Sequence, residues 1–337
     1  MEKNILFFLK YSIYLFPILL ITGPFLPDLI LSISTILFII FIYKKKEFDI
    51  FQSIYFKIYI LFLIYLIIRS LFTFDWLSIR PSLFYFRFGF FSLAIFYLLK
   101  KKIIDIKLFI TISSFLLLVI FFDSNLQNFT GQNIFGYKLY HSERISSFFK
   151  DELILGGTTF RIFSMIIPLI FFLNLKRKYL ISILIFILMT STILLSSERT
   201  STGLMIIYIL AFLVFVPIKI THKIIFAFMV SLSISIFFYF NDAQRERLVN
   251  KTLHSINIDN KKYDVILFSA MHQSHILTSI EMFKDNYFFG KGPKMYRKVC
   301  DDINFKKFRV GDHSCTTHPH NIIAQFLGEV GLVGFIF

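Results

Sequence analysis

The stretch KRKYLISILIFILMTSTILLSSERTS, residues 176–201, decides the fold of this chain. Three basic residues lead into an apolar run that extends from Tyr179 to Leu195 without a charge, and a polar turn follows. Inside a bilayer, backbone N–H and C=O groups must bond to each other, so a run of this kind crosses the membrane as a helix. The basic flank and the polar turn then mark its two ends.

The same pattern recurs along the whole sequence, which is 56% hydrophobic, only 17% charged and contains 47 Phe. A β-barrel would alternate apolar and polar residues over segments of roughly 10 residues, and the sequence lacks this alternation. We therefore predict an all-α, polytopic transmembrane helical bundle. Its ten apolar segments lie at about 4–22, 28–43, 55–72, 82–99, 108–122, 162–175, 179–196, 203–218, 223–240 and 320–337.

The first and last segments carry further information. The first has no small-residue cleavage site, so we interpret it as a membrane helix and not as a removed signal peptide. The tenth ends at Phe337 with no flanking charge. We therefore expect the natural chain to continue, and the segment given to be truncated at its C-terminus.

The formal net charge of +15 follows the membrane topology. With the N-terminus inside, the short outer loops hold only Arg80 and Arg199, whereas four short inner loops hold twelve basic residues. This asymmetry indicates how the chain is oriented in the membrane. It also accounts for the positive net charge without a nucleic-acid partner. The twelve are Lys44, Lys45, Lys46, Lys100, Lys101, Lys102, Lys107, Lys176, Arg177, Lys178, Lys219 and Lys223.

Three regions follow from this topology. Residues 1–240 form a nine-helix transmembrane bundle with an outer loop at about 123–161. Residues 241–319 form a large outer loop, and residues 320–337 form the tenth helix. Six of the eight histidines and both cysteines lie in the two loops, and His320 directly follows the second loop. Because an external compartment is oxidising, we predict a disulfide between Cys300 and Cys315.

The stretch CTTHPHN, residues 315–321, leads into the tenth segment. Pro319 suits a first helical turn, so His318 should lie at or just before the helix start, with His320 on the opposite side. One face of this helix is polar, and its residues either serve function or form interhelical hydrogen bonds. That face contains Asn321, Gln325 and Glu329. No carboxylate or free cysteine lies at a typical ligand spacing, so we predict no metal.

Two arginines in outer segments are candidates for anion binding. Arg199 in SSERTSTG, residues 196–203, opens a helix, and a guanidinium beside a helix N-terminus suits phosphate oxygens. The alternative is snorkelling or a pair with Glu198. The second is Arg144, which lies in ERISSFFKDELILGG, residues 143–157. The alternative to anion binding there is surface salt bridges within that loop.

The second loop contains HQSHILTSIEMFKDNYFFGKGPKMYRKVC, residues 272–300. His275, Ser279, Met282 and Phe283 fit a helix with mixed faces that lies on the membrane surface. GKG at residues 290–292 predicts a turn. It does not match a nucleotide-binding P-loop, which needs a longer glycine pattern followed by Lys and Ser or Thr.

In this order, the motifs RISSFFKDELILGG, SSERTS, MFKDNYFFGKGPKMYRKVC and CTTHPHNIIAQFLGEVGLVGF resemble the O-antigen ligase and polymerase superfamily of bacterial membrane glycosyltransferases. The likeness covers about residues 140–337, and HPHN followed by a helix with Q, E and G is its most specific part. The resemblance implies a multi-pass protein of a bacterial inner membrane with a large periplasmic loop and a periplasmic active face.

The resemblance also implies a reaction. Family members use a glycan linked to undecaprenyl diphosphate as donor, and they need no metal, nucleotide or other cofactor. Ligases pass the glycan to lipid A–core, whereas polymerases pass it to another repeat unit. The sequence leaves this choice open. A non-catalytic membrane protein and a transporter of lipid-linked glycans remain alternatives, although nearly all charge lies in loops.

The resemblance assigns roles to individual residues. His318 takes the place of the family's periplasmic histidine, as the base that accepts the acceptor's proton, and Arg199 that of its first arginine, on the diphosphate. Where many members carry a second arginine, this chain has His272. The candidates for substrate binding are Arg297, Arg144, Asn321, His272 and His275.

Overall fold

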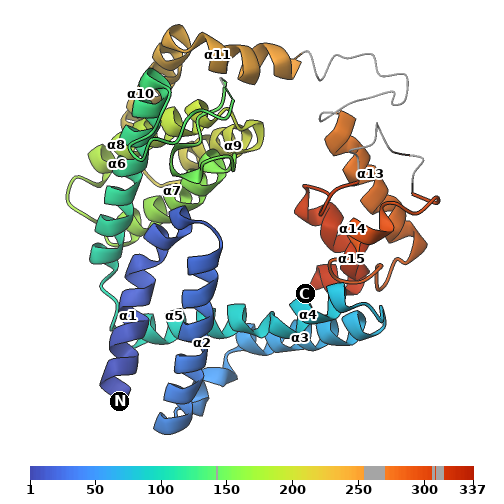
Figure 1. The fold of residues 1–337 in the computed structure, drawn as a ribbon. Helices are drawn as coiled ribbons and strands as arrows, with labels where there is room; N and C mark the ends of the chain where they lie inside the picture. Colours follow the sequence, from blue (N-terminus) through green and yellow to red (C-terminus); the bar gives the residue numbers. More distant parts are fainter. Residues whose placement is uncertain (142, 254–269, 306–307, 309–314) are drawn as a thin grey trace. The chain divides into compact units, whose positions relative to one another are not determined.

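The computed structural model describes all residues except 142, 254–269, 306–307 and 309–314 (Figure 1). His254 and His313, two histidines of the large loop, therefore lie outside the described residues. The described chain is helical, as predicted. Its longer helices are α1 (Glu2–Leu19), α2 (Phe25–Lys45), α3 (Ile54–Leu71), α4 (Trp76–Phe84), α5 (Phe86–Lys100), α6 (Ile106–Thr130), α7 (Leu155–Phe172), α8 (Lys178–Ser196), α9 (Arg199–Phe215), α10 (Ile220–Phe240), α13 (Ala270–Asp285) and α15 (Ile322–Ile336).

Eight spans among the described residues are long and apolar enough to cross a membrane, with α4 and α5 together forming one of them. The helices α9 and α15 are shorter apolar helices. All ten predicted segments therefore correspond to helices. The predicted polytopic helical fold is confirmed.

The chain divides into two compact units. Unit 1 contains Lys3–Ile30 and Leu98–Thr252, and unit 2 contains Leu31–Tyr97 and Leu253–Phe337. Each unit is described by itself below.

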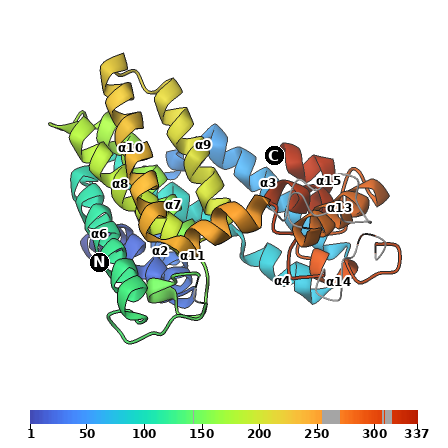
Figure 2. The ribbon, with the colours of Figure 1, turned by 90° about the horizontal axis from the view of Figure 1, so that it is seen from above.

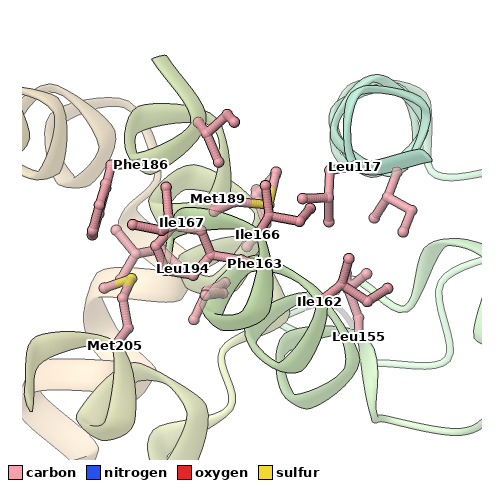
Figure 3. Packing of buried hydrophobic residues seen from close by; sticks show 14 of the residues in the cluster. Leu117, Leu155, Ile162, Phe163, Ile166, Ile167, Phe186, Met189, Leu194 and Met205 are labelled. Atoms are coloured by element: carbon pink, nitrogen blue, oxygen red, sulfur yellow. The ribbon is translucent and has the colours of Figure 1, made fainter. Parts of the chain in front are cut away.

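In unit 1, α8 packs against α6, α7 and α10 (Figure 2). Figure 3 shows Leu117 of α6, Ile166 of α7 and Met189 of α8 in the core that these helices share. Phe163 of α7 meets Phe186 of α8 edge to face, with ring centroids 4.7 Å apart. Aromatic pairs in this geometry add to the free energy of burial, so the many Phe residues fix how these helices pack.

Polar side chains at the end of α6 hold the loop that follows. The helix continues to Thr130, beyond the predicted end of its apolar segment at about residue 122. Asp123 accepts a hydrogen bond from the Ile134 N–H at 2.8 Å and another from the Ser147 hydroxyl. The side-chain oxygen of Gln127 accepts from the Ser147 N–H at 2.6 Å. These buried bonds fix the residues on either side of Arg144.

In unit 2, α3 packs against α4, and α13 lies beside α15 (Figure 1). The helix α15 is broken, because Gly331 has φ 65° and ψ −170°. Two carbonyls before the break bond to another segment instead of to the helix. The Gly328 carbonyl accepts from the Lys291 N–H at 2.9 Å, and the Glu329 carbonyl accepts from the Gly292 N–H at 2.7 Å.

The same segment also satisfies the amides after the break. The Leu332 N–H donates to the Tyr287 carbonyl at 2.8 Å, and the Val333 N–H donates to the Phe288 carbonyl at 3.1 Å. An interrupted helix is tolerated at membrane depth only where its backbone groups find such partners. Residues 287–292 thus supply the hydrogen-bonding partners that the broken helix requires.

The helix α3 donates hydrogen bonds both to the broken helix α15 and to residues 289 and 290. The Tyr65 hydroxyl donates to the carbonyl of Val330. Arg69 donates from Nε to the Phe289 carbonyl at 2.9 Å and from Nη2 to the Gly290 carbonyl at 2.6 Å. Arg69 is the charged residue in the last turn of this largely apolar helix. The structure gives it the role of a clamp on the loop.

We predict that Gly331→Ala destabilises the protein. A Cβ at this position would lie 2.4 Å from the Phe288 carbonyl oxygen, and the φ of 65° disfavours any residue with a side chain. We expect a loss of about 1–3 kcal/mol, measured by thermal unfolding in detergent.

The matched control is Gly203→Ala in α9, where an added Cβ meets nothing within 4 Å. This substitution should leave the stability unchanged or raise it by up to about 1 kcal/mol, because alanine favours helices. Equal melting temperatures for Gly331→Ala and the unmodified protein would contradict the role of the break.

Candidate functional site

A carboxylate organises the turn between α8 and α9 in unit 1. Ser197 adopts a left-handed conformation with φ 52°, and Glu198 follows it as the N-cap residue of α9. The Glu198 carboxylate accepts from the amides of Gly156 at 2.7 Å and Gly157 at 3.1 Å, and from the Ser201 hydroxyl at 2.9 Å. It therefore caps the positive N-terminal end of α7.

Two predicted site residues, Arg199 and Arg144, lie around this turn. Arg199 is the first residue of α9. The loop that carries Arg144 is attached to the end of α8, because the Ile145 N–H donates to the Leu195 carbonyl at 3.2 Å. Arg144 is half-buried and donates from Nη2 to the Leu153 carbonyl at 3.3 Å.

A third arginine, Arg247, joins them and was missed by the sequence reasoning. It lies in η4 (Glu246–Asn250), which continues α11 (Asp242–Arg245). Its Nε donates to the Ser197 carbonyl at 3.3 Å, and its Nη1 lies 3.8 Å from Glu143. Lys251 also pairs with Glu143 at 2.5 Å. The available signal was the spacing of Arg247 and Lys251, since residues four apart share a helix face.

The cluster is electropositive. Burial and the nearby charge of Arg247 hold the pKa of Arg144 below its usual value, and Glu198 opposes this to a smaller extent. Arg247 also repels Arg199 electrostatically. Arg247 and Lys251 pair with Glu143, Arg144 interacts with Glu198 and Arg247, and Arg199 interacts with Arg247, so these four cationic side chains share two carboxylates. The excess of positive charge suits an anion with more than one charge.

In unit 2, the stretch before α15 differs from its prediction. The helix begins at Ile322, with Asn321 as its N-cap, and the Asn321 side-chain oxygen accepts from the Ala324 N–H at 2.9 Å. His320 has φ 53°, so residues 318–320 do not follow a helical path. The prediction that His320 points away from His318 is therefore wrong, because it assumed helical spacing. Their ring centroids are 4.2 Å apart.

The turn gathers four histidines. His320 lies 5.6 Å from His272 and 5.4 Å from His275, measured between ring centroids. His272 and His275 come from α13, and the ring of His275 is buried. Two predicted substrate-binding residues therefore lie beside His320, which in turn adjoins the predicted base His318. Among the described residues, no group of three or more His, Cys, Asp or Glu has an arrangement that would hold a metal ion.

His318 is held in a defined state by its neighbours. The Thr317 hydroxyl lies 2.9 Å from Nδ1, and in the tautomer that carries its hydrogen on Nδ1 this nitrogen donates to the hydroxyl while Nε2 can accept a proton. Partial desolvation lowers the pKa of His318 below its usual 6.5, and nearby positive charges lower it further. These charges belong to His320, Lys294 and Arg297. A neutral imidazole near pH 7 is the form that a general base needs.

The segment that carries Arg297 is anchored on both sides. Arg297 lies in α14 (Tyr296–Val299), and the buried Tyr296 donates its N–H to Glu329 Oε1 at 3.1 Å. Gln325 donates to Glu329 Oε2 at 3.1 Å, so the polar face of α15 serves hydrogen bonding. At the far end of α14, Cys300 is joined to Cys315 by a disulfide, with Cα atoms 5.6 Å apart.

The predicted site residues thus form two groups. Arg199 and Arg144 lie together in unit 1, now with Arg247. His318, Arg297, His272, His275 and Asn321 lie in unit 2. The charge of Arg297 acts on His318, so within its own unit it adjoins the candidate base.

Comparison with known protein families finds one similarity. Residues 184–337 match the family model described as O-antigen ligase. Searches of the curated proteins and of the solved structures each returned no match. The matched part of the chain includes Arg199, Arg247 and His318, whereas Arg144 precedes it. The similarity to the O-antigen ligase and polymerase superfamily that the motifs predicted is therefore confirmed.

We predict that Lys294→Gln raises the pKa of His318. The folded protein disfavours the charged imidazole, and removing one neighbouring cation weakens that effect. Imidazole NMR titration, with His318→Gln to assign the signal, measures the change. The acid limb of any reaction that uses neutral His318 should move to higher pH in this variant.

The control is Lys284→Gln on α13, whose ammonium pairs with Glu281 at 2.8 Å. It should leave the titration of His318 unchanged. An unchanged or lower His318 pKa in Lys294→Gln would contradict the electrostatic account.

Proposed function

We propose that this chain, whose residues 184–337 match the O-antigen ligase family, is a membrane glycosyltransferase that moves a glycan from undecaprenyl diphosphate to an acceptor hydroxyl. The acceptor is lipid A–core, and the reaction takes place at the periplasmic face of a bacterial inner membrane. The observation that carries the proposal is the cluster of Arg144, Arg199 and Arg247, in which three guanidinium groups lie around one turn.

These arginines bind the leaving group. When the bond between the sugar's anomeric carbon and the diphosphate oxygen breaks, its electron pair stays on the diphosphate. Fixed guanidinium groups stabilise that developing charge, and their planar donors match phosphate oxygens. Glu198 keeps its carboxylate on the amides of α7, which orients the turn without opposing the anion directly. Neither a metal nor a nucleotide is needed, because the donor carries its own leaving group.

His318 activates the acceptor. Its Nε2 accepts the hydroxyl proton as the acceptor oxygen forms its bond to the anomeric carbon. For Nε2 to accept a proton, Nδ1 must carry the hydrogen, which then donates to the Thr317 hydroxyl 2.9 Å away. Thr317 is therefore a positioning residue, whose hydroxyl accepts from Nδ1 in the tautomer that the reaction requires.

The orientation of the chain supports the choice of face. The twelve basic residues of the short inner loops place the N-terminus in the cytoplasm. The loop of Arg144, the turn of Arg199 and the segment before α15 then fall on the opposite side. A lipid-linked glycan presents its diphosphate at this membrane surface, because its isoprenoid chain stays in the bilayer.

We predict that Arg247→Gln lowers glycan transfer by about 10²-fold, the loss typical of removing one group that stabilises developing charge. Arg245→Gln is the matched control. Arg245 lies two residues earlier and pairs with Asp242 at 2.7 Å, and its removal should leave transfer unchanged. His318→Ala should cost about 10²–10⁴-fold.

The assay uses the full-length natural protein in a host without its own ligase and polymerase, supplied with the lipid-linked repeat unit. Lipopolysaccharide gels report the product. A glycan joined to lipid A–core establishes a ligase, and an extended glycan still on undecaprenyl diphosphate establishes a polymerase. Full transfer by folded Arg247→Gln and His318→Ala variants, or no product with the protein in the membrane, would overturn the proposal.

A further inference from the structure

Unit 2 contains a basic pocket that the proposed reaction does not use. It has a volume of about 380 Å³ and lies between α4 and the stretch formed by α14 and the residues just before it. Three cations surround a small apolar surface. The lining residues are Trp76, Leu77, Arg80, Pro81, Lys294 and Arg297.

The chain fixes the two walls of this pocket to each other. Asp75 caps α4 by accepting from the Leu77 N–H at 2.9 Å, and the same carboxylate pairs with Lys298. A Cβ on Gly292 would lie 2.2 Å from the Thr73 methyl carbon, which shows how closely the segments approach. Asp75 is thus engaged by Lys298 and by the helix cap, which leaves Arg80 of the same helix available to a ligand, whereas Lys294 also interacts with Glu329.

Lys294 has an unusual backbone. Its φ is 63°, a conformation that glycine or asparagine adopts at lower cost. Residues held this way cluster at functional sites. The conformation directs the chain so that Lys294 and Arg297 line the same pocket.

The chemistry of the lining indicates its ligand. Trp76 is 66% exposed, so its indole offers a flat apolar face to a ring-shaped molecule. The guanidinium groups of Arg80 and Arg297 match a planar carboxylate, and Lys294 adds a third positive charge. A ring bearing a carboxylate satisfies both features at once, whereas a neutral sugar offers the two guanidinium groups no negative charge.

We propose that this pocket binds an acidic sugar, a uronic acid or a similar carboxylate-bearing residue, of the glycan that the protein handles. The inference rests on the proposed function for the nature of the substrate. Lys294 and Arg297 also act on His318, so the pocket adjoins the candidate base. It would select glycans that carry a negative charge close to the reacting hydroxyl.

The single tryptophan of the sequence makes the test direct, because all indole emission comes from Trp76. The protein in phosphatidylcholine nanodiscs is titrated with trigalacturonic acid and with its fully methyl-esterified form, which differs by the loss of charge. We expect a saturable change in emission with the acid and roughly tenfold weaker binding of the ester. Arg80→Gln should weaken binding of the acid by a similar factor, and Lys284→Gln should not.

Four results would overturn the proposal. They are no response to the acid, equal responses to acid and ester, equal competition by inorganic phosphate, and a response to phosphatidylglycerol nanodiscs that replaces the response to the acid. The last result would make the pocket a lipid-headgroup site. The titration measures binding without transfer, so failure here is distinguishable from failure of the proposed reaction. The variant Trp76→Phe confirms the source of the signal.

Discussion

The arrangement of unit 2 depends on the exchange of backbone hydrogen bonds at the break in α15. A continuous helix satisfies its own amides and carbonyls, but Gly331 interrupts that ladder. The carbonyls of Gly328 and Glu329 then accept from the amides of Lys291 and Gly292. Because unsatisfied backbone groups at membrane depth are very costly, the segment cannot leave without destabilising the helix. The hydrogen bonds at the break therefore hold residues 287–292 against α15.

In unit 1, side chains hold a polar turn in place. The helices of this unit pack through a large aromatic and aliphatic core, and side chains hold the polar turn between α8 and α9. Glu198 bonds to two amides of α7, and Arg247 bonds to the Ser197 carbonyl. The same contacts that close the turn also bring three arginines together. Mutual repulsion among them is a cost that an anionic ligand would offset.

The sequence alone predicted the helices well, because hydrophobic length and the distribution of lysine are local signals. It also singled out Arg199 and His318 from local motifs. It failed where the chain departs from helical spacing, as at His320, whose φ of 53° folds the ring back toward His318. It also missed Arg247, since this contact with Ser197 joins residues 50 apart in the chain. The positive φ of His320 and the partner of Arg247 could not be read from the residues nearby, although the spacing of Arg247 and Lys251 indicates a shared helix face.

The two ways of fixing polar groups have different consequences for specificity. In unit 2, backbone bonds to α15 and the Tyr296–Glu329 bond hold the segment that carries Lys294 and Arg297. The lining side chains of the basic pocket are thus supported by bonds that do not depend on their own identity. In unit 1, by contrast, Arg247 both closes the turn and contributes charge. Substitutions that change glycan preference should therefore be tolerated in the pocket of unit 2, while the arginine cluster of unit 1 is constrained by fold and charge together.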